Sequence, residues 1–374
     1  MITGKLRAAD SATDQCSLPT VILIQFASMD TPHDPLADQP HYPIPGTITV
    51  MSSTPTPAID IPPPPPRRRY RSRTRQQILA PLLLFGLTCV ATFWAGSSPN
   101  IQFMRHDFVN RVFPQFGGVA DGVVLIGRWQ DGFIYMSAVM AILLAHEMGH
   151  FLQALRYGVP ASLPFFIPMP FTPLGTMGAV IGMQGSEADR KELFDIGLSG
   201  PLAGLLVALP IAWIGIQQAI PIPMNFKFDP HDYHLQDPLL FKLMMQKLHP
   251  ELLPGQELAI NPLLMAGWVG MLITGLNMLP ISQLDGGHVS YSLFGRGSFW
   301  LARGVVVAAV CFIFFAGVYG WLVMLFLVTM IGVQHPPTAN DQVELGWGRR
   351  ILGLASLAIP VLCLAPNPIS AIGN

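Results

Sequence analysis

The segment AILLAHEMGHFLQAL, residues 141–155, places two histidines and a glutamate inside an otherwise apolar run. Ionisable side chains within a membrane span are costly and usually mark a functional site. His146 and His150 are four residues apart, so on a helix they project from one face and can bind a single Zn²⁺ through their imidazole nitrogens. Glu147 is placed to accept a proton from a zinc-activated water. The segment therefore predicts a hydrolytic zinc centre on a membrane-buried helix.

The composition indicates a membrane protein. Of the 374 residues, 51% are hydrophobic and only 11% are charged, whereas a soluble globular domain has about 25% charged residues. The formal net charge is -1, so the basic field that nucleic-acid binding requires is missing, and we expect no nucleic-acid partner. No CxxC pair occurs. We interpret the four cysteines as packing residues: Cys16, Cys89, Cys311 and Cys363.

The first part of the sequence is rich in Pro, Ser, Thr and Asp and ends in the proline run IPPPPP. Such a segment buries too little apolar surface to fold, which predicts disorder. The basic cluster RRRYRSRTR, residues 67–75, precedes the first apolar run, and basic residues beside a span favour the cytoplasmic side. We expect residues 1–77 to form a disordered, Pro-rich cytoplasmic arm. Residues 78–374 are expected to form a membrane-embedded domain that contains the zinc centre, with its catalytic core at about 131–290.

Apolar runs of about 20 residues, the length that crosses a bilayer, predict an all-α polytopic membrane protein with about six to seven transmembrane helices. The candidates are residues 78–95, 133–155, 196–216, 263–281, 300–318 and 319–333, with 351–364 as a weaker seventh. If the first span runs outward, alternation makes the second and the fourth run inward. The histidines of the second span then lie in its cytoplasmic half.

A catalytic zinc site needs a third protein ligand and one open position. Asp285 follows the inward-running span at 263–281, and so reaches the depth of the two histidines. We therefore expect Asp285 to be the third ligand, although a lone aspartate at such a position is more often an interfacial cap. Gly286 and Gly287, which follow it, are expected to allow tight backbone turns near the metal.

Two glycine-containing segments lie between these motifs. Residues 160–183 are rich in Pro and Gly and carry no charge, which favours a re-entrant hairpin beside the site, with a membrane-surface loop as the alternative. In GPLAG, Gly200 and Gly204 have the small-xxx-small spacing that lets helices pack closely. We expect this face to pack against the histidine-containing helix.

Three further features are interpreted as structural. His231 and His234 in HDYH lack helical i, i+4 spacing and a third acid, so we expect a solvated loop rather than a second metal site. Residues 237–248 have apolar positions at helical spacing and predict an amphipathic helix on the outer surface. His335 lies in HPPT, where two prolines predict a turn.

The motifs HEMGH, NMLPISQLDGG (277–287), GPLAG (200–204) and PLGTMGAVIG (173–182) occur together over about residues 133–288. In this combination the chain resembles the site-2 protease family of intramembrane zinc metalloproteases. HPPT and DPLLFKLM also look like a bacterial and plastid branch of that family.

The resemblance implies a three-helix catalytic core with His146, His150 and Asp285 as ligands of one zinc ion and Glu147 as the general base. It also implies that Asn277 engages the substrate or stabilises the transition state. The expected substrates are other membrane proteins with a transmembrane helix, cleaved within or near that helix in the lipid bilayer, as in regulated intramembrane proteolysis. The expected location is the bacterial cytoplasmic (inner) membrane, with the N-terminus cytoplasmic.

Three other functions are compatible with some of these features. Ionisable residues within spans also build metal transporters, but these predict an internal repeat, which we do not find. A catalytically silent membrane scaffold would not need all of His146, Glu147, His150 and Asp285. A zinc peptidase that acts on prenylated or soluble substrates at the membrane also fits the zinc motif.

Overall fold

The computed structural model describes residues 75–97, 121–172, 174–183, 185–221, 233–252, 256, 258–332, 335–367 and 369–371. The chain divides into two units, Met1–Pro65 and Pro66–Asn374, and every described residue belongs to the second unit. The arm expected at residues 1–77 therefore lies outside the described residues, apart from its last three. The domain boundary predicted there stays a prediction.

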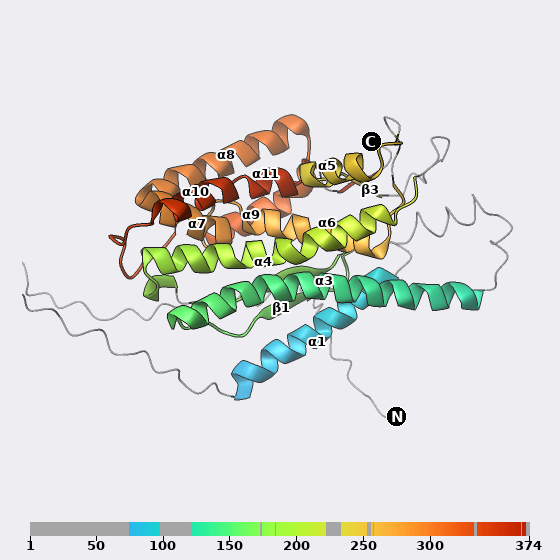
Figure 1. Cartoon of the computed structure of the whole chain (residues 1–374), viewed down its shortest axis with the longest axis horizontal. Coiled ribbons are helices and arrows are strands. Elements are labelled where there is room, and N and C mark those ends of the chain that lie inside the picture. Colours follow the sequence, from blue (N-terminus) through green and yellow to red (C-terminus); the bar gives the residue numbers. More distant parts are fainter. Residues whose placement is uncertain are drawn as a thin grey trace, which may run out of the picture. The chain divides into compact units, whose positions relative to one another are not determined.

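The second unit is mainly helical, which confirms the expected fold class (Figure 1). Its longer elements, in chain order, are α1 (Arg75–Ser97), α3 (Asp121–Tyr157), β1 (Phe165–Met169), β2 (Gly175–Val180), α4 (Arg190–Gln217), α5 (Leu239–Leu248), α6 (Pro262–Asn277), α7 (Asp285–Phe294), α8 (Ser298–Ala316), α9 (Leu322–Ile331), α10 (Trp347–Ser356) and α11 (Ile359–Cys363). Short 3₁₀ turns cover Gly185–Glu187, Gly295–Gly297 and Tyr319–Trp321. Two three-residue strands, β3 (Tyr233–Leu235) and β4 (Ile369–Ala371), pair antiparallel.

Within the described residues, four helical segments are long and apolar enough to cross a membrane: Gln77–Ser97, Trp129–Tyr157, Arg190–Gln217 and Asp285–Ala316. The expected count of six to seven spans is not confirmed. The fourth candidate, 263–281, becomes α6, which has 16 residues. The sixth, 319–333, contains only the ten-residue α9. The weaker seventh is divided between α10 and α11, and Pro360 lies at the start of α11.

Helices α3, α4 and α6 pack against one another and form a three-helix core (Figure 1). Small residues permit the close approach of α6. A Cβ atom added at Gly267 would lie 2.5 Å from the Cβ of Ala212 on α4, and one added at Gly270 would lie 2.9 Å from the Cδ1 of Ile142 on α3. Because helices in a membrane associate through such packing rather than through the hydrophobic effect, these glycines set the spacing of the core.

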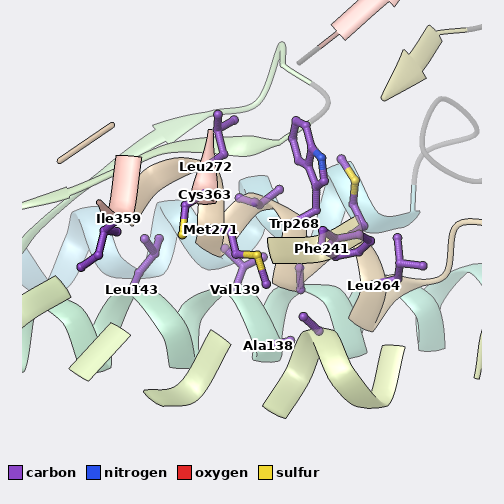
Figure 2. Close-up of a cluster of buried hydrophobic side chains, with 14 of the residues drawn as sticks. Ala138, Val139, Leu143, Phe241, Leu264, Trp268, Met271, Leu272, Ile359 and Cys363 are labelled. Atoms are coloured by element: carbon purple, nitrogen blue, oxygen red, sulfur yellow. The ribbon is translucent and has the colours of Figure 1, made fainter. Parts of the chain in front are cut away.

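The buried apolar side chains around α6 come from several helices (Figure 2). Trp268 and Met271 of α6 lie beside Val139 of α3 and Phe241 of α5, and α11 closes the cluster with Cys363. The indole N–H of Trp268 donates a hydrogen bond to the carbonyl oxygen of Gln236 at 3.0 Å, which satisfies its one buried donor. The amphipathic helix expected at 237–248 is observed as α5, with Phe241 and Met244 buried.

Strands β1 and β2 form an antiparallel hairpin directly after α3, where the re-entrant hairpin was expected. The hairpin lies against α1: Phe85 and Phe166 make an edge-to-face ring contact at 5.1 Å between centroids. Gly175 has φ +75°, and an added Cβ would lie 2.7 Å from the Cα of Thr92. Tyr135 of α3 donates a hydrogen bond to the carbonyl oxygen of Leu174 at 3.0 Å. The hairpin is thus packed against α1 and α3, and its re-entrant position in the membrane stays a prediction.

Candidate metal centre

The two histidines of the HEMGH motif lie on one face of α3, as their spacing predicts. His146 is 2% exposed, and its Nε2 atom lies 3.3 Å from Nε2 of His150. Both ligating nitrogens therefore point to the same position.

Asp285, the first residue of α7, completes the group. Its Oδ2 atom lies 3.1 Å from Nε2 of His146, and its Oδ1 atom lies 3.2 Å from Nε2 of His150. The potential ligand atoms of these three residues all lie within 4.8 Å of one another. Among the described residues, this is the one group of three or more His, Cys, Asp or Glu side chains that is arranged to hold a metal ion.

The hydrogen bonds around the histidines fit a zinc ion. The Nδ1–H group of His150 donates to the carbonyl oxygen of Ile196 at 2.7 Å, which leaves the Nε2 lone pair facing His146 and Asp285. A backbone carbonyl that fixes the tautomer of a histidine in this way is typical of metal ligands. Two imidazole lone pairs and a carboxylate that converge in a buried position also need a cation between them. Three such ligands match a catalytic zinc site.

Helix α4 approaches the two histidines through glycine. An added Cβ at Gly200 would lie 2.0 Å from Nε2 of His150, and one at Gly204 would lie 3.0 Å from Nδ1 of His146. The packing of GPLAG against the histidine-containing helix is thereby confirmed. Only glycine leaves the space that the His150 ring occupies.

Glu147 and Asn277 also lie at this centre. Glu147 is 3% exposed, and its carboxyl group interacts electrostatically with both histidines and Asp285. Asn277 is the last residue of α6, and its side-chain amide nitrogen lies 3.3 Å from Nε2 of His146. Side chains from α3, α6 and α7, which are up to 139 residues apart in the sequence, thus meet at one centre.

The turn between α6 and α7 brings Asn277 and Asp285 together. Ser282 in this turn has a left-handed backbone, with φ 50°. Gly286 and Gly287, in contrast, are helical residues of α7. A Cβ added at Gly286 would lie 2.0 Å from the carbonyl oxygen of Met278, and one at Gly287 would lie 2.2 Å from that of Ser282. These glycines are needed for close approach to the turn, and not for an unusual turn conformation as the sequence suggested.

Two further histidines lie close to α7, and sequence reasoning did not connect them. Nδ1 of His288, one helical turn after Asp285, lies 2.7 Å from Nε2 of His335. His335 belongs to the HPPT motif, which was interpreted only as a turn. The one sequence signal for these residues is their position: His288 directly follows LDGG, and His335 directly precedes the two prolines of HPPT. The side chains of His231 and His234 lie outside the part of the chain that the structure describes.

The comparisons with known proteins agree with this geometry. Residues 134–318 match the model of Peptidase family M50. The probable zinc metalloprotease EGY1, chloroplastic, of Oryza sativa subsp. japonica is 31% identical over 301 residues, which cover 78% of this chain and 51% of the relative. The corresponding EGY1 of Arabidopsis thaliana is 29% identical over 300 residues, covering 78% and 54%. EGY2 of Arabidopsis thaliana is 27% identical over 295 residues, covering 78% and 49%. No solved structure matches the chain.

The helical fold and the HExxH centre are similar to those expected of the membrane-embedded zinc metalloprotease class. Over residues 134–318 the chain is similar to the site-2 protease family, peptidase family M50. It spans about half the length of the curated relatives that it matches.

The relatives' names also bear on location. All of the named relatives are described as chloroplastic, which conflicts with the expectation of a bacterial cytoplasmic membrane. The expectation of a multi-pass membrane protein agrees with the four membrane-spanning candidates.

Proposed function

We propose that this chain is a zinc-dependent intramembrane endopeptidase that cuts other membrane proteins within or near a transmembrane helix. The observation that carries the proposal is the convergence of His146, His150 and Asp285 from α3 and α7, with Glu147 buried next to His146 on α3. Hydrolytic zinc sites with the HExxH pattern need this set of three ligands and one carboxylate base.

Each residue has a distinct role in the proposed reaction. His146, His150 and Asp285 would hold the zinc ion. The chemistry that zinc supplies at such a site is polarisation of the scissile carbonyl group and activation of a water molecule. Glu147 accepts a proton from the attacking water and delivers it to the leaving amine. Asn277, with its amide nitrogen 3.3 Å from His146, is placed to donate a hydrogen bond to an oxygen of the reacting peptide.

The β-hairpin offers a strand edge that can bind a substrate segment unwound at the scissile bond. A transmembrane helix has its amides hydrogen-bonded internally, so the scissile bond becomes accessible only after local unwinding. Within the described residues, β1 and β2 pair only with each other, which leaves each strand one edge without a strand partner. Such an edge can bind an extended segment by adding a strand. Gly178 of β2 approaches Ile273 of α6, so the hairpin lies next to the helix that ends at Asn277.

The orientation is part of the proposal. The basic cluster at 67–75 ends at the first residue of α1, and by the positive-inside rule the arm lies on the cytoplasmic face, or on the corresponding stromal face in a plastid. In this orientation the metal centre lies toward that face. Regulated intramembrane proteolysis, in which the cut releases a membrane-tethered regulator, is the biological role that such a site would serve.

Cleavage of a panel of labelled single-span membrane proteins by the purified, zinc-loaded protein in lipid vesicles tests the proposal. Glu147→Gln keeps the volume of the side chain and removes the base. We expect cuts within the spans for the wild type, a loss of about 10²- to 10⁴-fold in rate for Glu147→Gln, and an unchanged zinc content in the variant. A zinc chelator should abolish cleavage by the wild type.

Two outcomes would contradict the proposal. If Glu147→Gln cleaves as fast as the wild type, the glutamate is not the base. If the wild type and Asp285→Asn bind equally little zinc, the three residues do not form a zinc site, and the catalytically silent scaffold becomes the better interpretation.

A further inference from the structure

His335 and His288 form a hydrogen-bonded pair at the first turn of α7. Nε2 of His335 lies 2.7 Å from Nδ1 of His288, and the two rings meet edge to face with 4.9 Å between centroids. His288 follows Asp285 by three residues, so both side chains leave the same face of α7. The pair is thus attached to the helix turn that carries the third proposed zinc ligand.

His335 is the first residue of the segment 335–341, which we call the HPPT strap. This segment contacts Tyr291 of α7 through both of its ends. The ring of His335 stacks on that of Tyr291 with 4.4 Å between centroids and 21° between planes. The hydroxyl of Tyr291 donates a hydrogen bond to Oδ2 of Asp341 at 2.9 Å. The strap is therefore fixed to α7 at both of its ends.

The strap is also bound to the start of α4. The amide of Ala339 donates to the carbonyl oxygen of Ala188 at 2.9 Å, and the amide of Arg190 donates to that of Asn340 at 3.3 Å. Arg190 in turn donates to the carbonyl oxygens of Ser292 and Leu293, near the end of α7. The strap, α4 and α7 therefore form one hydrogen-bonded unit.

The hydrogen bonds determine where the protons lie. Nδ1 of His335 lies 2.6 Å from the carbonyl oxygen of Pro336, which can only accept, so this nitrogen carries a proton. Burial lowers the pKa of His335, which keeps the ring neutral and Nε2 free of a proton at neutral pH. Nε2 then accepts a hydrogen bond from the Nδ1–H group of His288. The direction of the hydrogen bond thus runs from α7 to the strap.

Helix α4 confines His288 from the opposite side. A Cβ atom added at Gly197 would lie 2.8 Å from the Cβ of His288. Gly197, Gly200 and Gly204 therefore face the three imidazoles of His288, His150 and His146, respectively. His288 thus faces the same glycine-containing side of α4 as the two proposed zinc ligands, and its other partner is the strap.

We propose that His335 is a positioning residue for the metal centre: through its hydrogen bond to His288 it fixes the first turn of α7, and thereby the carboxylate of Asp285. The proposal rests on the proposed function in taking Asp285 as a zinc ligand. Groups beyond the direct ligands tune a metal site by orienting the ligands. The HPPT motif thereby acquires a role besides ending a helix.

Zinc affinity of variant proteins tests this role. His335→Ala removes the acceptor, whereas His335→Gln places a side-chain oxygen that can accept from His288. We expect the zinc dissociation constant, measured by competition with a chelator, to rise about tenfold in His335→Ala. In His335→Gln it should stay within about twofold of the wild type, since the side-chain oxygen of glutamine retains the hydrogen bond from His288.

His249→Ala is the matched control. His249 also bridges two segments, through Nε2 to the carbonyl oxygen of Ile216 and Nδ1 to Glu251, each at 2.8 Å, but it lies at the other end of α4. We expect this variant to lower thermal stability without changing zinc affinity. A purely structural role for His335 predicts that the alanine variants of both histidines behave alike.

A second measurement does not depend on zinc. Hydrogen exchange of the amides of residues 285–289 in the metal-free protein should be faster in His335→Ala than in the wild type, and close to the wild-type rate in His335→Gln. Equal exchange rates and equal zinc affinities in wild type and His335→Ala would overturn the proposal. If instead Asp285→Asn leaves zinc binding unchanged, the proposed function itself is wrong, and the positioning role falls with it.

Discussion

At His150, the two ring nitrogens have different partners. Nδ1 donates to the carbonyl oxygen of Ile196, and Nε2 faces His146 and Asp285. Ile196 and Gly200 both belong to α4. The orientation of this imidazole therefore depends on the backbone of a neighbouring helix, and a small change in the distance between α3 and α4 would displace it.

Alanine substitutions of the α4 glycines measure that dependence. Gly200→Ala places a methyl group 2.0 Å from Nε2 of His150, whereas Gly204→Ala places one 3.0 Å from Nδ1 of His146. We expect zinc affinity to fall by at least about tenfold in Gly200→Ala, as it does when the groups that orient a metal ligand are lost, and by less in Gly204→Ala. Chelator competition on the purified variants gives both values.

Gly304→Ala is the control for these variants, because no heavy atom lies within 4 Å of the added Cβ on α8. It should leave zinc affinity unchanged and raise stability by about 0.5–1 kcal/mol through helix propensity. If Gly200→Ala and Gly304→Ala bind zinc equally well, the close contact between α4 and His150 has no effect on the metal centre.

The residues of the centre could be predicted from sequence because their types and spacing carry the chemistry. His146, Glu147 and His150 occupy adjacent positions of one helix, and Asp285 was identified from the depth of its span. His288 and His335 could not be paired in this way. They are 47 residues apart, and only the fold of the strap onto α7 brings them within 2.7 Å.

At the scale of elements, the strap has a pH dependence that follows from His335. Burial lowers the pKa of His335, despite a hydrogen bond to Pro336 and the nearby charge of Asp341, both of which favour the protonated ring. The facing groups are His288 and Tyr291. In the unfolded chain a histidine has a pKa of about 6.5, so as the pH falls the unfolded chain takes up a proton at a higher pH than the folded protein does. The free energy of unfolding that neutral His335 contributes is therefore fully present above about pH 6.5. It is lost as the pH falls below it.

Thermal unfolding at pH 7.5 and pH 5.5 checks this expectation. We expect the wild type to lose roughly 2–4 °C more in Tm than His335→Gln over this interval, which corresponds to about 1 kcal/mol. His249 also makes the Tm depend on pH, because burial lowers its pKa but its hydrogen bonds to Ile216 and Glu251 outweigh that effect and raise it. That group stabilises the fold at low pH and loses its contribution as the pH rises through its raised pKa. Both proteins contain His249, so the difference between them isolates the contribution of His335. An equal loss of Tm in both proteins would contradict the account of His335.

The helices that were predicted well are those whose apolar runs end at clear signals. Residues 196–216 became α4, which Asp189 caps through its side chain and Glu192. Hydropathy fails where a helix is covered by protein instead of lipid. Most of α6 is buried, and it ends at Asn277, before Pro280. Gly317, with φ +69°, ends α8, and only the ten-residue α9 follows. Apolar character alone does not distinguish short helices such as α6 and α9 from spans.

For the whole molecule, the described elements all belong to the unit Pro66–Asn374. A variant that starts at residue 67 should therefore fold, bind one zinc ion and unfold within about 2–4 °C of the full chain, a change of no more than about 1 kcal/mol. Zinc content and thermal unfolding in detergent test this. A truncated protein that aggregates or binds no zinc would show that the first 66 residues are part of the catalytic fold.

The central claim is hydrolysis of a peptide bond within a membrane span. Its most direct test is cleavage of a single-span substrate in lipid vesicles prepared in ¹⁸O-labelled water, followed by mass spectrometry of the products. The account predicts a cut inside the span, one ¹⁸O atom in the new carboxylate of the N-terminal product, and formation of both products at least about 10²-fold more slowly with Glu147→Gln. Cuts found only in the soluble parts of the substrate, or cuts inside the span that Glu147→Gln makes at the wild-type rate, would contradict it.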